Sequence, residues 1–300
     1  MIVYFIQAHR HERQVLNLVN VLLSCPESFV IVSFDSALPE ALRLDRPNYM
    51  ARASSRKIRR GDFSPVDEYL DALRWLREKG VAYDWFVNLC GQTLPARPIR
   101  EVSREIAACE FDAVMHHFPM FSATSEWSER ESADRLDFRY RKLTKRSLTT
   151  AERAVAKCAK LANAVQPWVR INTGYGLLLG KRTPRPPGLT FHGGVYFKCL
   201  SRRCGEYLLD FCAREPAVAD YFRRILVPDE IFMQTVLLNH PFRISGDRKM
   251  FVNFAGAKGG HPNNLELADL EQMSGFHFAR KFDFDSTAYA RALERAAGKD

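Results

Sequence analysis

The chain has 300 residues, of which 46% are hydrophobic and 26% are charged, and its basic residues outnumber its acidic residues by nine. This hydrophobic content is enough for a packed core, so disordered, collagen-like and simple coiled-coil chains are excluded. No stretch approaches the roughly 18 consecutive hydrophobic residues of a membrane span, and the first residues are typical of a β-strand rather than of a signal peptide. We therefore expect a cytoplasmic protein that attracts an anionic partner.

The first third of the chain alternates predicted strands with predicted helices. The strands are short hydrophobic runs, and the helices carry hydrophobic residues at a spacing of three to four. This order predicts an α/β fold whose mostly parallel central sheet is flanked by helices. The expected strands are residues 1–8, 29–34 and 85–90, and the expected helices are residues 11–23, 64–80 (with Ser64 as the N-cap) and 98–109.

Polar residues follow the carboxyl ends of these predicted strands, which is where open α/β sheets bind their ligands. Gln7 and His9 lie at the end of the first strand, Asp35 at the end of the second, and residues 88–93 at the end of the third. The other histidines fit structural roles better than catalytic ones. The seven cysteines form no C-x-x-C pair and no H-E-x-x-H motif occurs, so we expect no metal site.

The middle of the chain, residues 122–188, has a different composition. Residues 137–160 contain eight basic residues and only two acidic ones, and a proline-rich stretch follows at residues 183–188. We expect a basic helical insertion, made of a helix and a loop, that lies outside the central sheet. Residues 1–121 and 189–300 would then be the two halves of one domain.

The last third contains the candidate catalytic residues. A strand is expected at residues 193–197, a helix at about 201–213, and a hydrophobic helix that begins at Pro228. Asp229 and Glu230 fall in the first turn of that helix, where the helix dipole favours ionised carboxylates. An ionised carboxylate in a rigid position is suited to act as a general base. The alternative is that these residues only cap the helix.

Basic residues lie between aromatic residues near the carboxyl end. Arg248 precedes a strand-like segment at residues 250–254, and Arg280 and Lys281 lie within the string Phe278-Ala-Arg-Lys-Phe-Asp283. Such cations could bind a diphosphate or a nucleic-acid backbone. The alternative is a solvent-exposed basic face, and no glycine-rich phosphate-binding motif is present.

Five strings that occur in order along nearly the whole chain resemble the core-2/I-branching enzyme family of glycosyltransferases, which includes the peptide O-xylosyltransferases. The third and fourth strings each consist of two pieces. The strings Asn-Leu-Cys-Gly, which is part of the second, and Phe-Ala-Arg-Lys-Phe-Asp, which is the fifth, are the most specific. They are Tyr4-Phe-Ile-Gln-Ala-His9, Trp85-Phe-Val-Asn-Leu-Cys-Gly-Gln-Thr-Leu-Pro95, Gly194-Val-Tyr-Phe197 with Leu200-Ser-Arg202, Pro228-Asp-Glu230 with Gln234-Thr235, and residues 278–283.

The resemblance implies a GT-A-like fold and an inverting, metal-independent transfer of a sugar from a UDP-sugar donor. The first candidate for the donor sugar is N-acetylglucosamine and the second is xylose. No cofactor is expected. By position, Glu230 is similar to the catalytic base of the family and Asp229 to its neighbour. Arg248 and Lys281 resemble the pair that holds the UDP phosphates, and Asp35 resembles the acidic residue that reads the nucleotide; Gln7, His9 and Arg280 lie beside these positions.

The resemblance leaves the substrates open. Thr93 stands where the family usually has an Asp, and residues 137–160 lie where the acceptor-contacting region varies. The expected acceptor is a hydroxyl group of a glycan, a lipid-linked molecule or a small molecule. The alternatives are a nucleic-acid or anionic-membrane binding module on an α/β scaffold, and a relative that binds the donor but is inactive.

The charge excess is local. Residues 51–60, 137–160 and 181–187 carry more than the whole excess, and Arg248 and Lys281 lie outside these three clusters. We therefore expect the clusters to bind a phosphorylated or lipid-linked acceptor, or to hold the protein peripherally on the inner face of an anionic membrane. Nucleic acid is not the expected partner.

Overall fold

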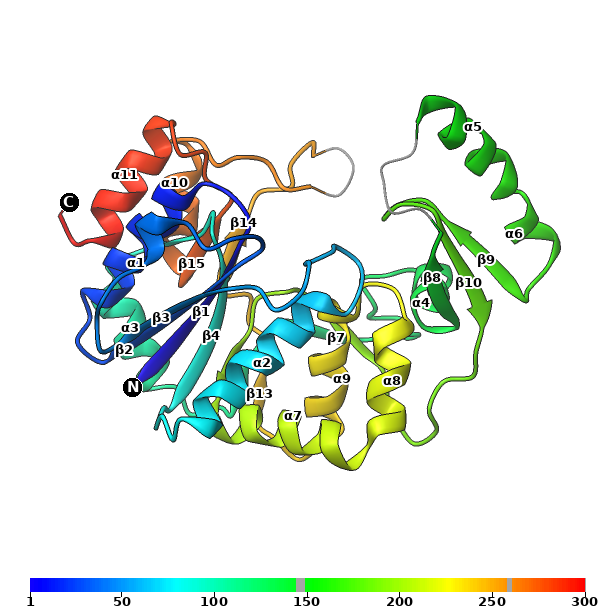
Figure 1. Cartoon of the computed structure of the whole chain (residues 1–300), viewed down its shortest axis with the longest axis horizontal. Coiled ribbons are helices and arrows are strands. Elements are labelled where there is room, and N and C mark those ends of the chain that lie inside the picture. Colours follow the sequence, from blue (N-terminus) through cyan, green and yellow to red (C-terminus); the bar gives the residue numbers. More distant parts are fainter. Residues whose placement is uncertain (144–148, 258–260, 300) are drawn as a thin grey trace.

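A computed structural model describes residues 1–143, 149–257 and 261–299 (Figure 1). Its described residues form a seven-stranded central sheet of order β13-β6-β12-β4-β1-β2-β3. All neighbouring strands in it are parallel except the two pairs made by β12. The expectation of a mostly parallel sheet is therefore confirmed. The strands are β1 (Ile2–Ala8), β2 (Ser28–Phe34), β3 (Tyr49–Ala53), β4 (Trp85–Cys90), β6 (Ala113–Val114), β12 (Cys199–Ser201) and β13 (Ile244–Ser245).

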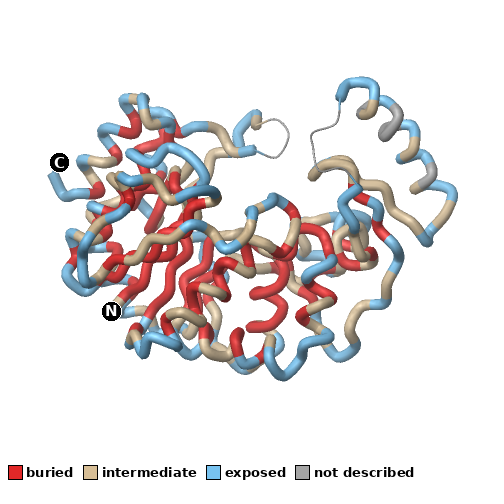
Figure 2. The backbone as a smooth tube through the Cα atoms, viewed as in Figure 1, coloured by how far each residue is buried: buried red, intermediate tan, exposed pale blue. Residues whose placement is uncertain are grey.

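Helices cover both faces of this sheet because its central strands are hydrophobic on both sides. In β1, Tyr4 and Ile6 pack into one core, whereas Val3 and Phe5 pack into the other. The first core is closed by α1 (Glu12–Leu23), α3 (Ile99–Ala107) and α11 (Thr287–Ala296), and the second by α2 (Ser64–Glu78), α7 (Arg202–Arg214), α8 (Pro216–Arg224) and α9 (Phe232–Leu238). Figure 2 shows the buried residues concentrated in the sheet and in the helix faces beside it.

Short elements complete this part of the chain. None of the helices in the described ranges has the length and hydrophobicity needed to cross a bilayer. The short elements are the 3-10 turns η1 (Glu40–Leu42), η2 (Pro228–Glu230) and η3 (Met273–Gly275), the helix α10 (Asp269–Gln272), and a small sheet in which β15 (Phe278–Arg280) lies between β14 (Met250–Val252) and β5 (Leu94–Pro95).

The insertion is less helical than the sequence suggests. It contains the three-stranded antiparallel sheet β8-β10-β9, formed by β8 (Phe138–Lys142), β9 (Val169–Asn172) and β10 (Leu178–Arg182). Phe138 and Leu178 are buried, whereas Arg141 and Lys181 are exposed. Buried and exposed residues therefore alternate along these strands, although the many basic residues make this pattern hard to recognise in the sequence. The expectation of a helix and a loop alone was therefore wrong. The insertion also carries α4 (Glu129–Leu136), α5 (Thr150–Ala159) and α6 (Ala162–Val165).

The insertion lies outside the central sheet, as expected, and projects from one end of the molecule (Figure 1). Its two ends are joined by the antiparallel pair of β7 (His117–Pro119) and β11 (His192–Gly194). The single strand expected at residues 193–197 is wrong, because the chain leaves β11 after Gly194 and enters β12 only at Cys199. The intervening segment, residues 195–198, belongs to the candidate site.

Candidate functional site

The turn that carries the two candidate carboxylates is held in a strained conformation. Val227 has a φ of 55°, which is rare for a β-branched residue, and its N–H donates to the Gly61 carbonyl at 3.0 Å. Pro228 then begins the 3-10 turn η2, and Ile231 separates this turn from α9. Asp229 and Glu230 therefore do not lie in the first turn of the α-helix, as the sequence suggested.

Burial, rather than a helix dipole, determines how this acid pair titrates. Burial and the neighbouring charge of Asp229 raise the pKa of Glu230 to about 7, although its side chain keeps 33% of its exposure. Burial also raises the pKa of Asp229, one of whose carboxylate oxygens has no hydrogen-bond partner in the described structure. The expectation that both groups are held ionised is therefore corrected: the pair retains a proton more readily than ordinary carboxyls do.

Lys198 lies directly behind the acid pair, and its side chain is buried. Its ammonium group donates to the carbonyls of Val195 at 3.1 Å, Tyr196 at 3.0 Å and Asp229 at 2.9 Å. Burial lowers the pKa of Lys198 to about 8, while the charges of Asp229 and Glu230 oppose that shift. Sequence reasoning missed this residue, although a lone lysine within the hydrophobic run Val195-Tyr-Phe-Lys-Cys-Leu200 was a signal of a buried, paired cation.

The insertion brings a second cation to the pair. Arg135, in α4, donates to Glu230 Oε2 at 3.3 Å and stacks on the ring of Trp127 at 3.7 Å from its centroid. This contact opposes the upward shift in the pKa of Glu230. Arg135 carried no signal in the sequence, because only the folded insertion places α4 against η2.

The loop of residues 54–63 connects the acid pair to the carboxyl end of the sheet. Its Ile58 N–H donates to Asp35 Oδ1 at 3.0 Å, and its Gly61 carbonyl accepts from Val227. Three residues of chain span at most about 11 Å, so Asp35 and the turn before Asp229 belong to one site. In the same loop, Arg60 lies over the ring of Tyr175 from the insertion.

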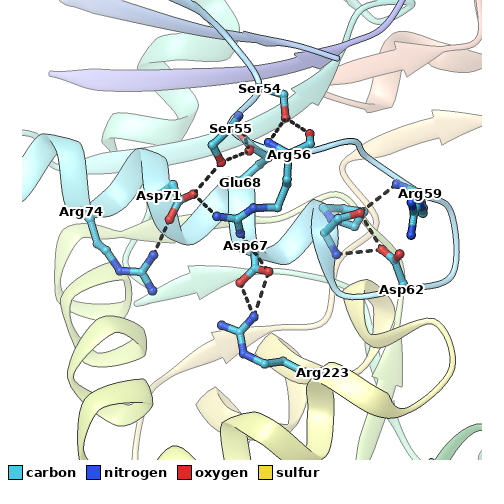
Figure 3. Close-up of polar contacts among 12 residues, drawn as sticks. Ser54, Ser55, Arg56, Arg59, Asp62, Asp67, Glu68, Asp71, Arg74 and Arg223 are labelled. Atoms are coloured by element: carbon cyan, nitrogen blue, oxygen red, sulfur yellow. Dashed lines mark hydrogen bonds and ion pairs between the residues drawn. The ribbon is translucent and has the colours of Figure 1, made fainter. Parts of the chain in front are cut away.

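A buried carboxylate fixes this loop to α2 (Figure 3). Glu68 is fully buried and accepts hydrogen bonds from the Ser55 N–H at 3.0 Å, the Ser55 hydroxyl at 2.7 Å and the Ser33 hydroxyl at 2.8 Å. Burial alone would raise the pKa of Glu68, but these hydrogen bonds outweigh it and hold the pKa below its usual value. At the other end of the loop, Asp62 accepts from both the N–H and the hydroxyl of Ser64, so Ser64 is not the N-cap expected.

Two arginines of the first basic cluster, residues 51–60, form ion pairs that contribute to this anchoring. Arg56 pairs with Asp67 at 2.8 Å and with Asp71 at 2.9 Å, and Arg52 lies 3.4 Å from Glu68. In the third cluster, Arg185 pairs with Asp137 at 2.6 Å. These arginines hold the protein's own carboxylates, so the expectation that their clusters bind an external anion is wrong for them. Lys145 and Arg146 of the second cluster lie outside the described residues.

A pocket of about 600 Å³ lies beside the ends of β1 and β2 and the beginning of α1. His9 and Arg10 line one part of it, and Phe34 and Phe284 provide hydrophobic walls. Gln14, which is buried and also lines the pocket, donates to the Phe282 carbonyl at 3.1 Å, while its Oε1 accepts no hydrogen bond in the described structure. The pocket thus offers a ligand the cation of Arg10, two aromatic walls and one free acceptor.

The other residues at the sheet end are used structurally. Gln7 donates from Nε2 to the Pro65 carbonyl at 3.0 Å, which ties β1 to α2. Thr93 is buried, and its hydroxyl contacts the N–H and the sulfur of Cys90. In this chain Thr93 therefore shapes the turn after β4.

The candidate phosphate-binding residues occupy two places. Arg248 donates to both carboxylate oxygens of Glu126 at 2.6 Å, next to the Trp127 on which Arg135 stacks. Arg280 and Lys281 lie at the opposite end of the paired strands β14 and β15. Within the described ranges, the Lys281 ammonium makes no hydrogen bond or ion pair, and Arg280 Nε is buried without a partner. The structure thus brings Arg280 and Lys281 together and places Arg248 apart from them.

Backbone contacts join these parts to the acid pair. Asn88 of β4 donates to the Tyr196 carbonyl at 3.0 Å and accepts from the Lys198 N–H at 2.7 Å. The charges of Asp229 and Arg280 both act on the pKa of Tyr196, so both lie in the neighbourhood of this residue. The site therefore presents a carboxyl group with a pKa near neutrality on one side and unpaired cations on the other. In the described ranges no three His, Cys, Asp or Glu residues are grouped so as to hold a metal ion.

No family model and no curated protein matches the chain. Among solved structures it is similar to a protein described as a glucose-1-phosphate thymidylyltransferase from Bacillus anthracis, with 9% identity over 71% of this chain and 78% of that one and a TM-score of 0.33. It is also similar to 4-diphosphocytidyl-2C-methyl-D-erythritol synthase from Anaerococcus prevotii, with 8% identity over 92% and 95% of the two chains and a TM-score of 0.38. These scores are too low to support a conclusion about activity, so the geometry of the site carries the argument.

Proposed function

We propose that this protein is an inverting glycosyltransferase with a GT-A-like fold, related to the core-2/I-branching enzymes. It would transfer one sugar from UDP to a hydroxyl group without a divalent metal. The first candidate for that sugar is N-acetylglucosamine and the second is xylose. The acceptor would be a glycan, a lipid-linked molecule or a small molecule, and the protein would work in the cytoplasm. The observation that carries the proposal is Glu230, a half-buried carboxyl group with a pKa of about 7 between Lys198 and Arg135.

Glu230 has the properties that the proposed chemistry needs from a base. A base is most effective when its pKa lies near the working pH, because it is then ionised and still takes the proton readily. Glu230 would take the proton of the acceptor hydroxyl while the acceptor oxygen bonds to the anomeric carbon of the donor. The bond from that carbon to the phosphate oxygen breaks, and UDP leaves with the electron pair. Attack from the face opposite UDP inverts the configuration.

The cations would stabilise the charge that develops on the departing diphosphate. Lys281 and Arg280 have unused donors at the end of β15, and Arg248 could exchange Glu126 for a phosphate oxygen. Such charge-assisted hydrogen bonds act where the negative charge grows, as a metal ion would. The pocket beside His9 and Asp35 would hold the nucleoside, with the free Gln14 oxygen accepting from a ribose hydroxyl or a base N–H.

Calorimetry with UDP and a panel of UDP-sugars in the presence of EDTA tests this proposal. We expect UDP to bind, and we expect Lys281→Ala to weaken binding roughly 10- to 100-fold through the loss of a charged hydrogen bond. Lys299→Ala, which removes an exposed lysine elsewhere, should have no effect. Failure of the wild-type protein to bind any uridine nucleotide would contradict the function, and binding only after addition of Mg²⁺ or Mn²⁺ would contradict the metal-free mechanism.

A further inference from the structure

The tip of the insertion exposes large hydrophobic side chains. Leu161, Val165 and Trp168 lie within eight residues of one another in sequence. Their solvent-exposed fractions are 72%, 83% and 69%. Leu143 and Leu179 of the same insertion are also exposed, so it holds five of the eight exposed large hydrophobic residues in the described chain. Figure 2 shows that exposed and half-buried residues predominate in the coloured part of the insertion. Hydrophobic residues gathered in this way mark an interaction surface.

Hydrogen bonds hold these side chains outward. Asn163 donates to the Ile171 carbonyl at 2.9 Å and accepts from the Ile171 N–H at 2.9 Å. Gln166 likewise donates to the Val169 carbonyl and accepts from the N–H groups of Trp168 and Val169. The polar side chains of the segment therefore face β9, and the hydrophobic ones face solvent. This is the reverse of the arrangement in an ordinary surface loop, and the hydrogen bonds show that the structure specifies it.

The outer face of the small sheet continues this surface. Leu179 lies opposite Arg141, and Lys181 lies opposite Arg139, so these four residues share one face of the antiparallel sheet. Leu179 is exposed on this face together with Arg141 and Lys181. Hydrophobic and basic side chains thus alternate here.

The insertion also carries the charge excess of the whole chain. Residues 138–182 contain eleven basic residues and one acidic residue, which leaves the rest of the chain slightly acidic. Arg170 and Arg139 pair with Asp134 and Asp220. Four others are exposed and have no carboxylate partner within the described ranges: Arg141, Lys142, Lys181 and Arg182.

We propose that this surface, formed by Leu161, Val165 and Trp168 with the unpaired cations Arg141 and Lys181 of the outer sheet face, docks the protein on an anionic lipid bilayer. The hydrophobic side chains would enter the interface between headgroups and acyl chains, where tryptophan is favoured. The cations would contact the anionic headgroups, which attract basic residues near the membrane surface. A nucleic acid would also bind these cations through its phosphates. It has no hydrocarbon layer, however, in which the exposed side chains of Leu161, Val165 and Trp168 could be buried.

Docking in this way keeps the candidate site close to the membrane. Tyr175, whose ring lies beside Gly61 and Arg60, follows Trp168 by seven residues, and such a length spans at most about 25 Å. A lipid-linked acceptor held at the surface would then lie near Glu230. This last step rests on the proposed function, whereas the docking itself does not.

Sedimentation of the full chain with lipid vesicles tests the proposal. We expect binding to vesicles of phosphatidylcholine with phosphatidylglycerol, and much weaker binding to phosphatidylcholine alone. The double variant Leu161→Ser/Trp168→Ser should bind the anionic vesicles at least tenfold more weakly, and so should Arg141→Glu/Lys181→Glu, which reverses two charges on the outer face. Leu267→Ser, at an exposed leucine outside the insertion, and Arg100→Glu/Arg104→Glu, on α3, are the matched controls and should bind as the wild type does.

Duplex DNA separates the lipid from a general polyanion. The serine variant should keep the DNA affinity of the wild-type protein, because only hydrophobic side chains are changed, and it should bind UDP unchanged. The proposal is overturned if the wild type does not prefer anionic vesicles, or if the serine variant binds them as well as the wild type does. Either result would contradict membrane docking only and would not test the proposed transferase activity. Conversely, a wild type that does not bind UDP would contradict the transferase activity and would not test docking.

Discussion

At the scale of single residues, the acid pair owes its properties to its surroundings. Asp229 and Glu230 are adjacent carboxyls with little access to water, and Lys198 and Arg135 offset part of the cost of burying them. The charges of these cations oppose the rise in pKa that burial imposes on both carboxyls. With them, the pKa of Glu230 falls near neutrality, which is where a base has its greatest effect.

The pKa of Glu230 predicts how activity and stability depend on pH. Below about 7, release of UDP from the donor should rise about tenfold per pH unit, because only ionised Glu230 accepts a proton. A carboxyl whose pKa is raised on folding binds its proton more tightly in the folded state, so the stability it contributes is present at low pH and lost as pH rises through about 7. Calorimetric melting should therefore show Glu230→Gln gaining stability over the wild type between pH of about 5 and about 8.

Glu131→Gln is the control for this pH effect, because Glu131 also pairs with Arg135 but is exposed. Its melting temperature should follow that of the wild type at both values of pH. If Glu230→Gln showed the same difference from the wild type at low and high pH, Glu230 would not have the raised pKa described above.

Residue types at the candidate site were partly predictable. The sequence singled out Asp229 and Glu230 because two carboxylates directly after a proline were expected to open a helix, whereas Lys198 was missed although it lies within a hydrophobic run. Their titration could not be predicted, since the direction of a pKa shift depends on burial and on cations such as Arg135 that come from distant parts of the chain.

At the scale of elements, the loop of residues 54–63 depends on one helix. Its serines and Arg56 bind carboxylates of α2 (Figure 3). At its other end, the Gly61 carbonyl accepts from the Val227 N–H in the turn before the acid pair. The loop thus transmits the position of α2 to both Asp35 and Asp229. The hydrogen bonds of Glu68 are the central part of this anchoring, because that side chain is fully buried.

Replacing Glu68 with Gln should loosen the loop. The new amide group would face donors from Ser33, Ser55 and Arg52, so buried hydrogen bonds are lost at a cost of roughly 1–3 kcal/mol in the free energy of unfolding. Urea denaturation measures this loss, and trypsin should cleave faster at the arginines of the loop. Glu78→Gln, at the exposed end of the same helix, should change neither result. Unchanged stability in Glu68→Gln would show that the loop is held by other contacts.

The sequence predicted the elements with strong hydrophobic periodicity and failed where polar contacts set the geometry. β1, β2, β4 and α2 were expected within about two residues of their bounds, because buried strands and amphipathic helices leave a clear pattern. The strands of the insertion were missed, because exposed cations interrupt their hydrophobic face. The break between β11 and β12 was missed as well, because it depends on carbonyls turned toward Lys198.

At the scale of the whole molecule, the site forms where the insertion meets the rest of the chain. The ring of Tyr175 packs against Gly61, where an added Cβ atom would come within 2.7 Å of the ring. This contact, together with Arg135 and Glu230, connects the insertion to the loop and to the acid pair. No local pattern in the sequence predicts such a junction, because Arg135 and Glu230 are 95 residues apart and Gly61 and Tyr175 are 114 apart.

Gly61→Ala should disturb this junction. The substitution meets the Tyr175 ring and also places alanine at a φ of 86°, so we expect destabilisation of more than about 1 kcal/mol. Gly80→Ala is a matched control, since Gly80 has a φ of 63° but open space around it. Urea denaturation of both variants separates the backbone cost from the contact with the ring. Gly61→Ala should also be partly rescued by Tyr175→Ala, and equal losses in the two glycine variants would contradict a tight junction.

The central claim is that Glu230 is the base of a UDP-sugar transferase. The most direct test measures the release of UDP from each donor of a UDP-sugar panel by the wild type and by Glu230→Gln, with UDP affinity measured in parallel. We predict that Glu230→Gln lowers the release of UDP by roughly 10²- to 10⁴-fold and leaves UDP affinity nearly unchanged. Wild-type turnover in Glu230→Gln, or the absence of UDP release from every donor by the wild type, would contradict the account.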